Sequence, residues 1–80
     1  METIEVIRAR ILTLCEEHDL TINGLATVSA IPPSSLKNIL YGKSQNPKII
    51  TIKILCDGLG ITLGEFFSTL EFDLLEQQIK

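Results

Sequence analysis

The sequence predicts an all-α fold, and three observations support this prediction. Apolar residues recur at intervals of three and four nearly throughout the chain, which is the spacing of amphipathic helices. Glycine and proline stand between the apolar segments rather than in runs. The β-branched stretch 49–54 has no hairpin partner elsewhere, and its apolar spacing continues to Leu59. The 80 residues therefore fit one helical domain with a modest core.

The first two helices are placed by their caps and their apolar positions. Thr3 is expected to cap a helix that ends near residues 18–19 and that turns inward Ile4, Ile7, Ile11, Leu14 and Cys15. Thr21 is expected to cap a short second helix, because its hydroxyl can accept a hydrogen bond from a free amide of the first turn. That helix turns Leu25 and Ala26 inward and ends near Ser29.

Proline and glycine delimit the third helix. Proline fits the first turn of a helix but not its interior, so the helix is predicted to start at the pair Pro32-Pro33. Gly42 is expected to end it as a C-terminal cap. Its core side is then formed by Leu36, Ile39 and Leu40.

Two further helices follow a polar loop. The fourth helix is predicted over 49–59, with Gly58 and Gly60 closing it, from an apolar stripe formed by Ile49, Ile52, Leu55, Cys56 and Leu59. The segment 62–65 has the spacing of a capping box, which predicts a fifth helix whose apolar positions reach Leu70. These five helices form the predicted bundle, a domain over residues 1–70.

Residues 71–80 form a C-terminal extension with Phe72, Leu75 and Ile79 on one helical face. Two interpretations of this face remain open. The first is a short sixth helix that folds back on the core. The second is a dimerisation helix, and we expect the protein to be a homodimer.

The charge distribution favours a polyanionic partner although the net charge is −3 and the pI about 4.9. No acidic residue lies between Asp19 and Asp57, and that stretch carries Lys37, Lys43, Lys48 and Lys53. All ten acidic residues lie outside it. The central segment is therefore expected to supply the positive field that nucleic acid requires. Lys48 and Lys53 either add to this field or simply solvate the fourth helix.

The stretch 4–70 resembles the lambda-repressor-like, Cro and XRE-type helix-turn-helix DNA-binding domains. The resemblance is carried, in order and without a gap, by Leu25-Ala26, Ile31, Leu36, Ile39, Gly42-Lys43, Asn46-Pro47, Leu55 and Leu59-Gly60-Ile61. It implies a helix-turn-helix formed by segments 21–28 and 33–41, with the second helix in the major groove of double-stranded DNA. By analogy with the family, the protein is expected to be a transcriptional regulator, usually a repressor that occupies an operator with an inverted repeat.

In that family the front of the third helix faces the bases, which here implies Pro33, Ser34, Lys37 and Asn38 as base-reading residues. The helical spacing agrees for three of them, because the buried side of the helix leaves Ser34, Lys37 and Asn38 outward, together with Tyr41. Asparagine can bond an adenine edge with two hydrogen bonds, and lysine can donate to guanine. Lys37 and Asn38 are therefore the strongest candidates for sequence readout.

The resemblance also implies contacts to phosphates from the start of the second helix and from the loop after the third. The phosphate-contact candidates there, with two outward residues of the third helix, are Thr21, Asn23, Ser35, Tyr41, Lys43, Ser44 and Asn46. Such contacts set the position of the protein on DNA without reading sequence.

Four positions depart from the family pattern. Ile22 stands where a phosphate-contacting glutamine is common, and Gly24 replaces a helix-forming residue, which weakens the second helix by about 1 kcal/mol. Ala30 occupies the usual turn glycine, so a left-handed backbone there carries roughly 1 kcal/mol of strain. Pro33 has no side-chain donor for a base. Ile22, Pro33 and the acidic pI support an alternative, a protein-interaction module or antitoxin-like partner that keeps the fold without strong DNA binding.

Catalysis and metal binding are not expected. The chain has one histidine and shows no nucleophile–base pair, paired carboxylates or phosphate-binding glycine loop, so neither an enzyme nor a cofactor is predicted. Cys15, His18 and Cys56 lack a fourth ligand, and the two cysteines fall on apolar faces, where reduced core thiols are typical.

The remaining expectations concern location and surface residues. The acidic N-terminus does not resemble a secretory signal, and no apolar run is long enough to cross a bilayer, so a cytoplasmic protein without membrane contact is expected. Arg8 and Arg10 are expected to serve solubility or local ion pairing.

Overall fold

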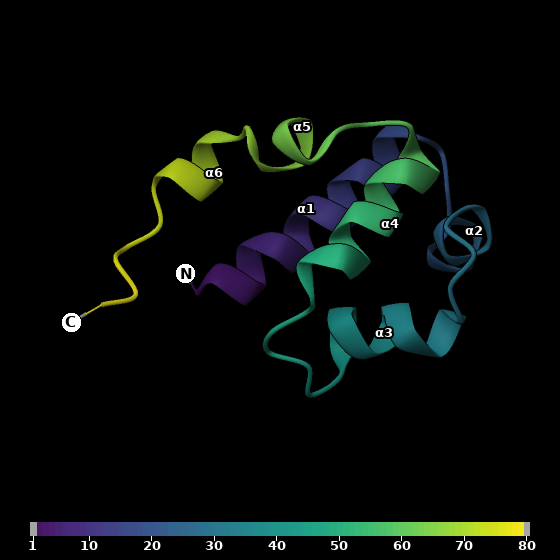
Figure 1. Ribbon diagram of the computed structural model, residues 1–80, viewed down its shortest axis with the longest axis horizontal. Coiled ribbons are helices and arrows are strands. Elements are labelled where there is room, and N and C mark those ends of the chain that lie inside the picture. Colours follow the sequence, from purple (N-terminus) through teal and green to yellow (C-terminus); the bar gives the residue numbers. More distant parts are fainter. Residues whose placement is uncertain (1, 80) are drawn as a thin grey trace.

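The computed structural model describes residues 2–79, which form six helices and no strand (Figure 1). The helices are α1 (Thr3–Glu17), α2 (Ile22–Val28), α3 (Pro33–Tyr41), α4 (Ile49–Leu59), α5 (Leu63–Phe67) and α6 (Leu70–Asp73). The predicted all-α fold is confirmed. The bounds of α3 and α4 match the predicted ones.

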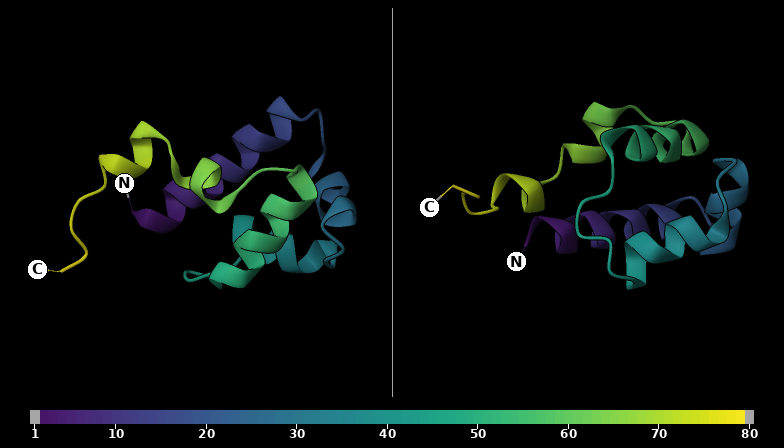
Figure 2. Two further views of the ribbon diagram at one scale, coloured as in Figure 1. Left: turned by 45° about the horizontal axis from the view of Figure 1, so that its top comes forward. Right: turned by 60° about the horizontal axis from the view of Figure 1, so that its bottom comes forward.

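The core lies where one side of each of the first five helices meets the others. α4 runs in nearly the same direction as α1, α2 lies at the end of the molecule away from the two termini, and α3 lies along one side (Figures 1 and 2). Among the side chains that are completely buried are Leu25, Leu36, Leu55, Cys56 and Phe66. The predicted inward positions of α1 to α4 are buried with one exception. Ile49, predicted on the apolar stripe of the fourth helix, is 57% exposed, because it is the first residue of α4 and lies at the edge of the buried side.

Gly58 has a different role from the predicted one. It lies inside α4 rather than after it, and Gly60 alone caps the helix, with a φ of 71°. A Cβ atom at Gly58 would lie 3.0 Å from the Ser29 Cα, so the end of α2 approaches α4 too closely for a side chain. Glycine is needed there for close packing of the two helices.

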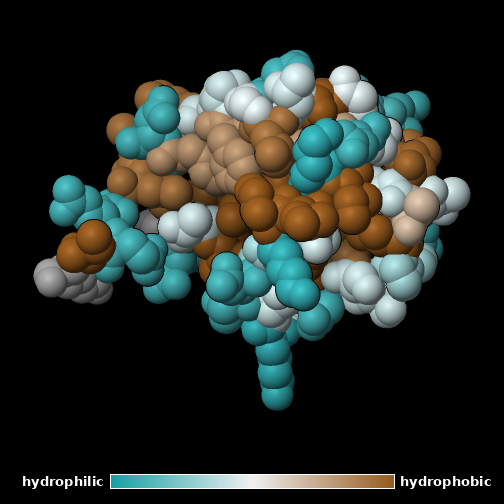
Figure 3. Space-filling model, viewed as in Figure 1, coloured by the Kyte–Doolittle hydropathy of each residue, from teal (hydrophilic) through white to brown (hydrophobic). Residues whose placement is uncertain are grey.

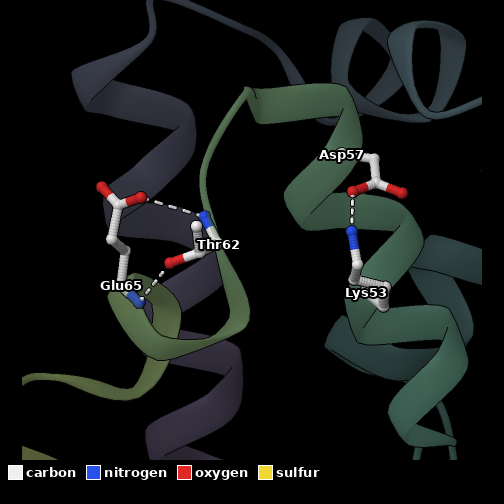
Figure 4. A network of polar contacts seen from close by, with 4 residues as sticks. All are labelled: Lys53, Asp57, Thr62 and Glu65. Atoms are coloured by element: carbon white, nitrogen blue, oxygen red, sulfur yellow. Dashed lines mark hydrogen bonds and ion pairs between the residues drawn. The ribbon is translucent and has the colours of Figure 1, made fainter.

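Two of the three predicted N-terminal caps are confirmed. The Thr21 hydroxyl accepts a hydrogen bond from the Gly24 amide at 2.9 Å. Thr62 and Glu65 bond each other's amides reciprocally at 3.0 Å (Figure 4). The cap predicted at Thr3 is wrong, since α1 begins one residue earlier with Glu2 as its cap. The Glu2 amide donates to the Glu5 carboxylate at 3.0 Å, so an acidic residue of the first turn satisfies that amide.

The C-terminal extension forms less helix than its apolar spacing suggested. The helix predicted to reach Leu70 ends at Phe67, and α6 covers only four residues, so the face with Ile79 is not continuous. Phe72 packs its ring against those of Phe66 and Phe67, with centroids 6.2 and 4.9 Å apart. This packing supports the interpretation of a short helix folded back on the core. Lys80 of the extension and Met1 lie outside the described residues.

No helix within residues 2–79 is long and apolar enough to cross a membrane. The longest, α1, has 15 residues, and charged side chains lie on its sides away from the core.

Candidate DNA-binding surface

The two helices α2 and α3 are joined by a tight turn over residues 29–32. The turn is closed by hydrogen bonds from the Ala30 amide to the Thr27 carbonyl at 3.1 Å and from the Ile31 amide to the Ala26 carbonyl at 3.0 Å. Ala30 has a φ of 54°, which confirms the predicted left-handed conformation at a residue that is not glycine. The half-buried Ile31 then packs against the core, which fixes where α3 begins.

α3 separates a buried side from an exposed side. Leu36, Ile39 and Leu40 are at most 6% exposed and belong to the core that residues of α1, α2 and α4 share. The opposite side carries the residues predicted to read bases, and all four are exposed: Pro33, Ser34, Lys37 and Asn38. Ser35 and Tyr41 are exposed as well. Because α3 lies along an outer edge of the molecule (Figure 2), this side is open to a large partner.

Asn38 lies close to the glycine that ends the helix. A Cβ atom at Gly42 would lie 2.7 Å from the Asn38 carbonyl oxygen and would also collide with the side-chain amide oxygen. The Asn38 amide group therefore lies along the last turn of α3, over Gly42. Gly42 itself has a φ of −92°, so it is required here for space rather than for a left-handed backbone.

The phosphate-contact candidates flank the exposed side of α3 at two places. Thr21 and Asn23 are exposed at the start of α2, and the Thr21 hydroxyl, although it caps the helix, can still donate its proton. Lys43 and Asn46 are exposed in the loop after α3, whereas Ser44 is half-buried. Four of these five residues are therefore open to a partner, two before α3 in the sequence and two after it.

Arg8 holds the end of α3 and the following loop against α1. Its Nε donates to the Ile39 carbonyl at 2.7 Å, and its Nη2 donates to the carbonyls of Ser44 at 3.0 Å and Gly42 at 3.4 Å. The Ile39 carbonyl belongs to the last turn of α3 and has no partner within the helix. The guanidinium supplies that partner and places a positive charge at the negative end of the helix dipole.

The expectation that Arg8 and Arg10 serve solubility or local pairing is therefore wrong. Arg10 donates from Nε to the Phe66 carbonyl at 2.8 Å and from Nη2 to the Glu65 carbonyl at 2.9 Å, at the end of α5. Both arginines lie beside the apolar stripe of α1 and are half-buried. An arginine next to an inward-facing stripe is the signal that could have indicated a buried partner.

The lysines of the central segment differ in their surroundings. Lys37, Lys43 and Lys48 are exposed on α3 and the following loop. Lys53 forms an ion pair with Asp57 one turn further along α4 (Figure 4). The positive field beside α3 is therefore supplied by the first three lysines and Arg8, and the charge of Lys53 is largely balanced.

The two cysteines are core residues. Cys15 and Cys56 are free thiols, 5% and 0% exposed, and burial raises the pKa of both. A raised pKa keeps a thiol protonated, so it is a poor nucleophile and a poor metal ligand at neutral pH. Among residues 2–79, no three His, Cys, Asp or Glu side chains come close enough to bind a metal ion.

A capped short helix, a tight turn and a second helix with one open, basic side define a helix-turn-helix domain. The chain belongs to the Cro/C1-type HTH DNA-binding domain family, whose model matches residues 10–71. The family is one of DNA-binding domains and not of enzymes, in agreement with the sequence prediction.

A solved structure has the same fold as this chain. The crystal structure of the prophage Lp1 protein 11 is similar to this chain with a TM-score of 0.80 and 28% sequence identity. The similarity covers 92% of this chain and 97% of the prophage protein. No curated protein matches the sequence significantly.

Proposed function

We propose that the protein is a cytoplasmic transcriptional repressor that binds an inverted repeat in double-stranded DNA as a homodimer. Membership of the Cro/C1-type family supports DNA binding and regulation of transcription. The observation that carries the proposal is the exposed side of α3, which combines amide, hydroxyl and ammonium groups on a helix whose opposite side is buried. A helix of this kind fits the major groove.

Within this proposal, residues 1–70 are the DNA-binding domain and Lys37 and Asn38 read base edges. Ser34 adds a hydroxyl that can reach a base, and Pro33 offers an apolar contact to a thymine methyl group. The position of Asn38 over Gly42 directs its amide to bases near the end of α3 rather than near its start.

The remaining candidates contact the DNA backbone. Thr21 and Asn23 approach one phosphate region from the start of α2, and Ser35 and Tyr41 approach from α3. Lys43, Ser44 and Asn46 approach another region from the loop that Arg8 holds. These contacts fix the position of α3 in the groove and supply most of the salt-dependent affinity.

Selection of bound sequences from a random duplex pool tests the proposal directly. Recovery of one motif in two inverted copies is expected. Weak binding that is independent of both sequence and salt would contradict DNA binding and would favour a protein-interaction module.

Two substitutions separate base reading from backbone contact. Asn38→Ala is expected to lower affinity by about 1–3 kcal/mol at one operator position and to relax the base preference there. Lys43→Ala is expected to weaken binding to all sequences and to reduce the slope of log K against log salt by about 1. An equal loss on every sequence for Asn38→Ala, or an unchanged salt slope for Lys43→Ala, would remove that residue from its proposed role.

A further inference from the structure

The outer side of α4 is apolar although it faces solvent. The inner side of this helix is formed by Ile52, Leu55, Cys56 and Leu59. On the opposite side, Ile50 is 69% exposed and Ile54 is half-buried, and Ile49 at the edge is 57% exposed. A helix that is apolar on both sides is typical of one covered on both sides. In a single chain, α4 is covered on only one.

The apolar surface continues beyond α4. Figure 3 shows hydrophobic side chains gathered at the centre of this face, over α4 and onwards to α5 and α6, with hydrophilic side chains mainly above and below them. The half-buried Leu63 and Phe67 of α5 adjoin the core next to this surface. An apolar centre with a polar rim is the arrangement found in stable protein interfaces.

The charges beside the apolar centre indicate which partner covers it. Lys53 and Asp57 are 50% and 59% exposed on the outer side of α4, one helical turn apart. In a two-fold dimer, a surface meets a second copy of itself in reverse order. Two antiparallel α4 helices whose two-fold axis passes near residue 55 would therefore bring Lys53 of each copy next to Asp57 of the other. In that register the two Ile54 side chains pack between the charged pairs, and each Ile50 packs against the end of the other α4 helix.

From these observations we propose that the outer side of α4, with Ile54 near its centre and Ile50 towards its end, binds a second copy of this chain. This inference deepens the proposed function, because it assigns the dimer interface of the DNA-binding protein. The exposed side of α3 lies on a neighbouring side of the molecule, below α4 in Figure 1. A second copy on α4 thus leaves α3 open in both subunits.

The C-terminal extension fits this role less well than its sequence suggested. Phe72 packs against the aromatic rings of α5, and Leu75 is half-buried. Two of the three residues predicted for a dimerisation helix thus have intramolecular contacts. Leu74, 72% exposed, is left as a solvent-facing residue that serves as a control.

Ultracentrifugation of the full chain with Ile50→Glu and with Leu74→Glu tests the location of the interface. The unaltered protein is expected to be a dimer at micromolar concentration. Ile50→Glu should raise its dissociation constant by about thirty-fold or more, and Leu74→Glu should leave it unchanged. A helical circular dichroism spectrum confirms that each variant is folded. A monomeric unaltered protein, or a dimer that only Leu74→Glu disrupts, would overturn the proposal.

Charge reversal tests the antiparallel arrangement. K53D and D57K should each weaken the dimer by about ten-fold or more, because each places like charges opposite one another. An equimolar mixture of the two variants should form heterodimers with restored affinity. Restoration in the mixture requires contact between subunits and cannot arise from the ion pair within one helix. Failure of the mixture to associate would overturn this arrangement.

Binding of Ile50→Glu to a duplex with a single half-site separates this inference from the proposed function. An affinity equal to that of the unaltered protein, with weaker binding to the full inverted repeat, is the expected result. If the unaltered protein bound no selected duplex yet remained a dimer through α4, the proposed function would fail and the interface would stand. If Ile50→Glu bound the full repeat as tightly as the unaltered protein, the α4 interface would fail and DNA binding would stand.

Discussion

α1 carries two arginines, and they support opposite sides of the molecule. A separation of two residues along a helix corresponds to a rotation of about 200°, so Arg8 and Arg10 point away from each other. Arg8 binds carbonyls at the end of α3 and in the next loop, and Arg10 binds carbonyls at the end of α5. Both supply donors to helix ends that lack partners of their own.

The difference lies in what each supported helix does. α3 presents the candidate base-reading residues, whereas α5 contributes Phe66 to the core and has none of the candidate DNA contacts. Loss of the hydrogen bonds from Arg8 is therefore expected to lower both stability and DNA affinity, whereas loss of those from Arg10 is expected to lower stability alone.

Arg8→Ala is expected to have the largest effect. Loss of three hydrogen bonds from a charged group should lower the free energy of unfolding by about 3 kcal/mol, as measured by urea denaturation. DNA affinity of the folded variant should fall by about ten-fold or more, because the end of α3 and the loop with Lys43 lose their support.

Arg8→Lys is the matched control, since it keeps the charge but not the planar fork of donors. Its DNA affinity should lie between those of Arg8→Ala and the unaltered protein. If the folded Arg8→Ala variant bound DNA normally, the α1 anchor would have no part in positioning α3.

Arg10→Ala is expected to lower the free energy of unfolding by about 2 kcal/mol, because two charged hydrogen bonds and a contact with the Phe66 ring are lost. DNA affinity, measured on the folded variant by fluorescence anisotropy, should stay within about two-fold of the unaltered protein. A loss of affinity as large as that of Arg8→Ala would remove the distinction between the two sides.

The two arginine anchors also show what a sequence pattern can reveal. The bounds of α3 and α4 were predicted because proline, glycine and apolar spacing act locally. The acceptors of Arg8 are backbone carbonyls more than thirty residues away. Every residue has a carbonyl, so no pattern of side chains marks which ones are left without a partner.

The errors at the two chain ends have related causes. Thr3 and Glu2 both permit a helix start, and the choice depends on the Glu5 carboxylate reaching the Glu2 amide. In the C-terminal extension the apolar spacing was helical, but an isolated helix of that length is marginal without tertiary contacts. Phe72 has such contacts, whereas Ile79 is 87% exposed and lies outside the helix.

The exposure of the candidate base-reading residues could be predicted from the sequence, whereas their contacts with DNA remain predictions. Helical periodicity placed Lys37 and Asn38 opposite the buried side of α3, where the structure has them exposed. Which base each would contact depends on the DNA partner, and the chain alone does not encode it.

Ala30→Gly sharpens the comparison at the other end of α3. Glycine adopts the left-handed conformation without strain, so the variant should be about 0.5–1 kcal/mol more stable to urea. Asp19→Gly is a matched control, because Asp19 has the same φ of 54° in the turn between α1 and α2. Both variants should bind DNA normally if Arg8 holds α3 in place. Altered affinity in Ala30→Gly alone would show that the turn positions α3 as well.

The smallest expected effect concerns Cys15 and Cys56, which belong to the same buried core as residues of α3 and α5. Burial raises the pKa of each thiol above its ordinary value of 9.0, so the unfolded chain releases the proton first as pH rises. The contribution of each protonated thiol to the free energy of unfolding is fully present well below pH 9.0 and falls as pH rises through 9.0. At pH 9.0, where the unfolded thiol is half ionised, the loss is about 0.4 kcal/mol per thiol. The urea midpoint of Cys56→Ala should therefore depend less steeply on pH between pH 8 and 10 than that of the unaltered protein, whatever constant stability the substitution removes. Equal slopes would mean that Cys56 is open to solvent in the native state, and the core between the two arginine-supported helices would then be looser than its contacts indicate.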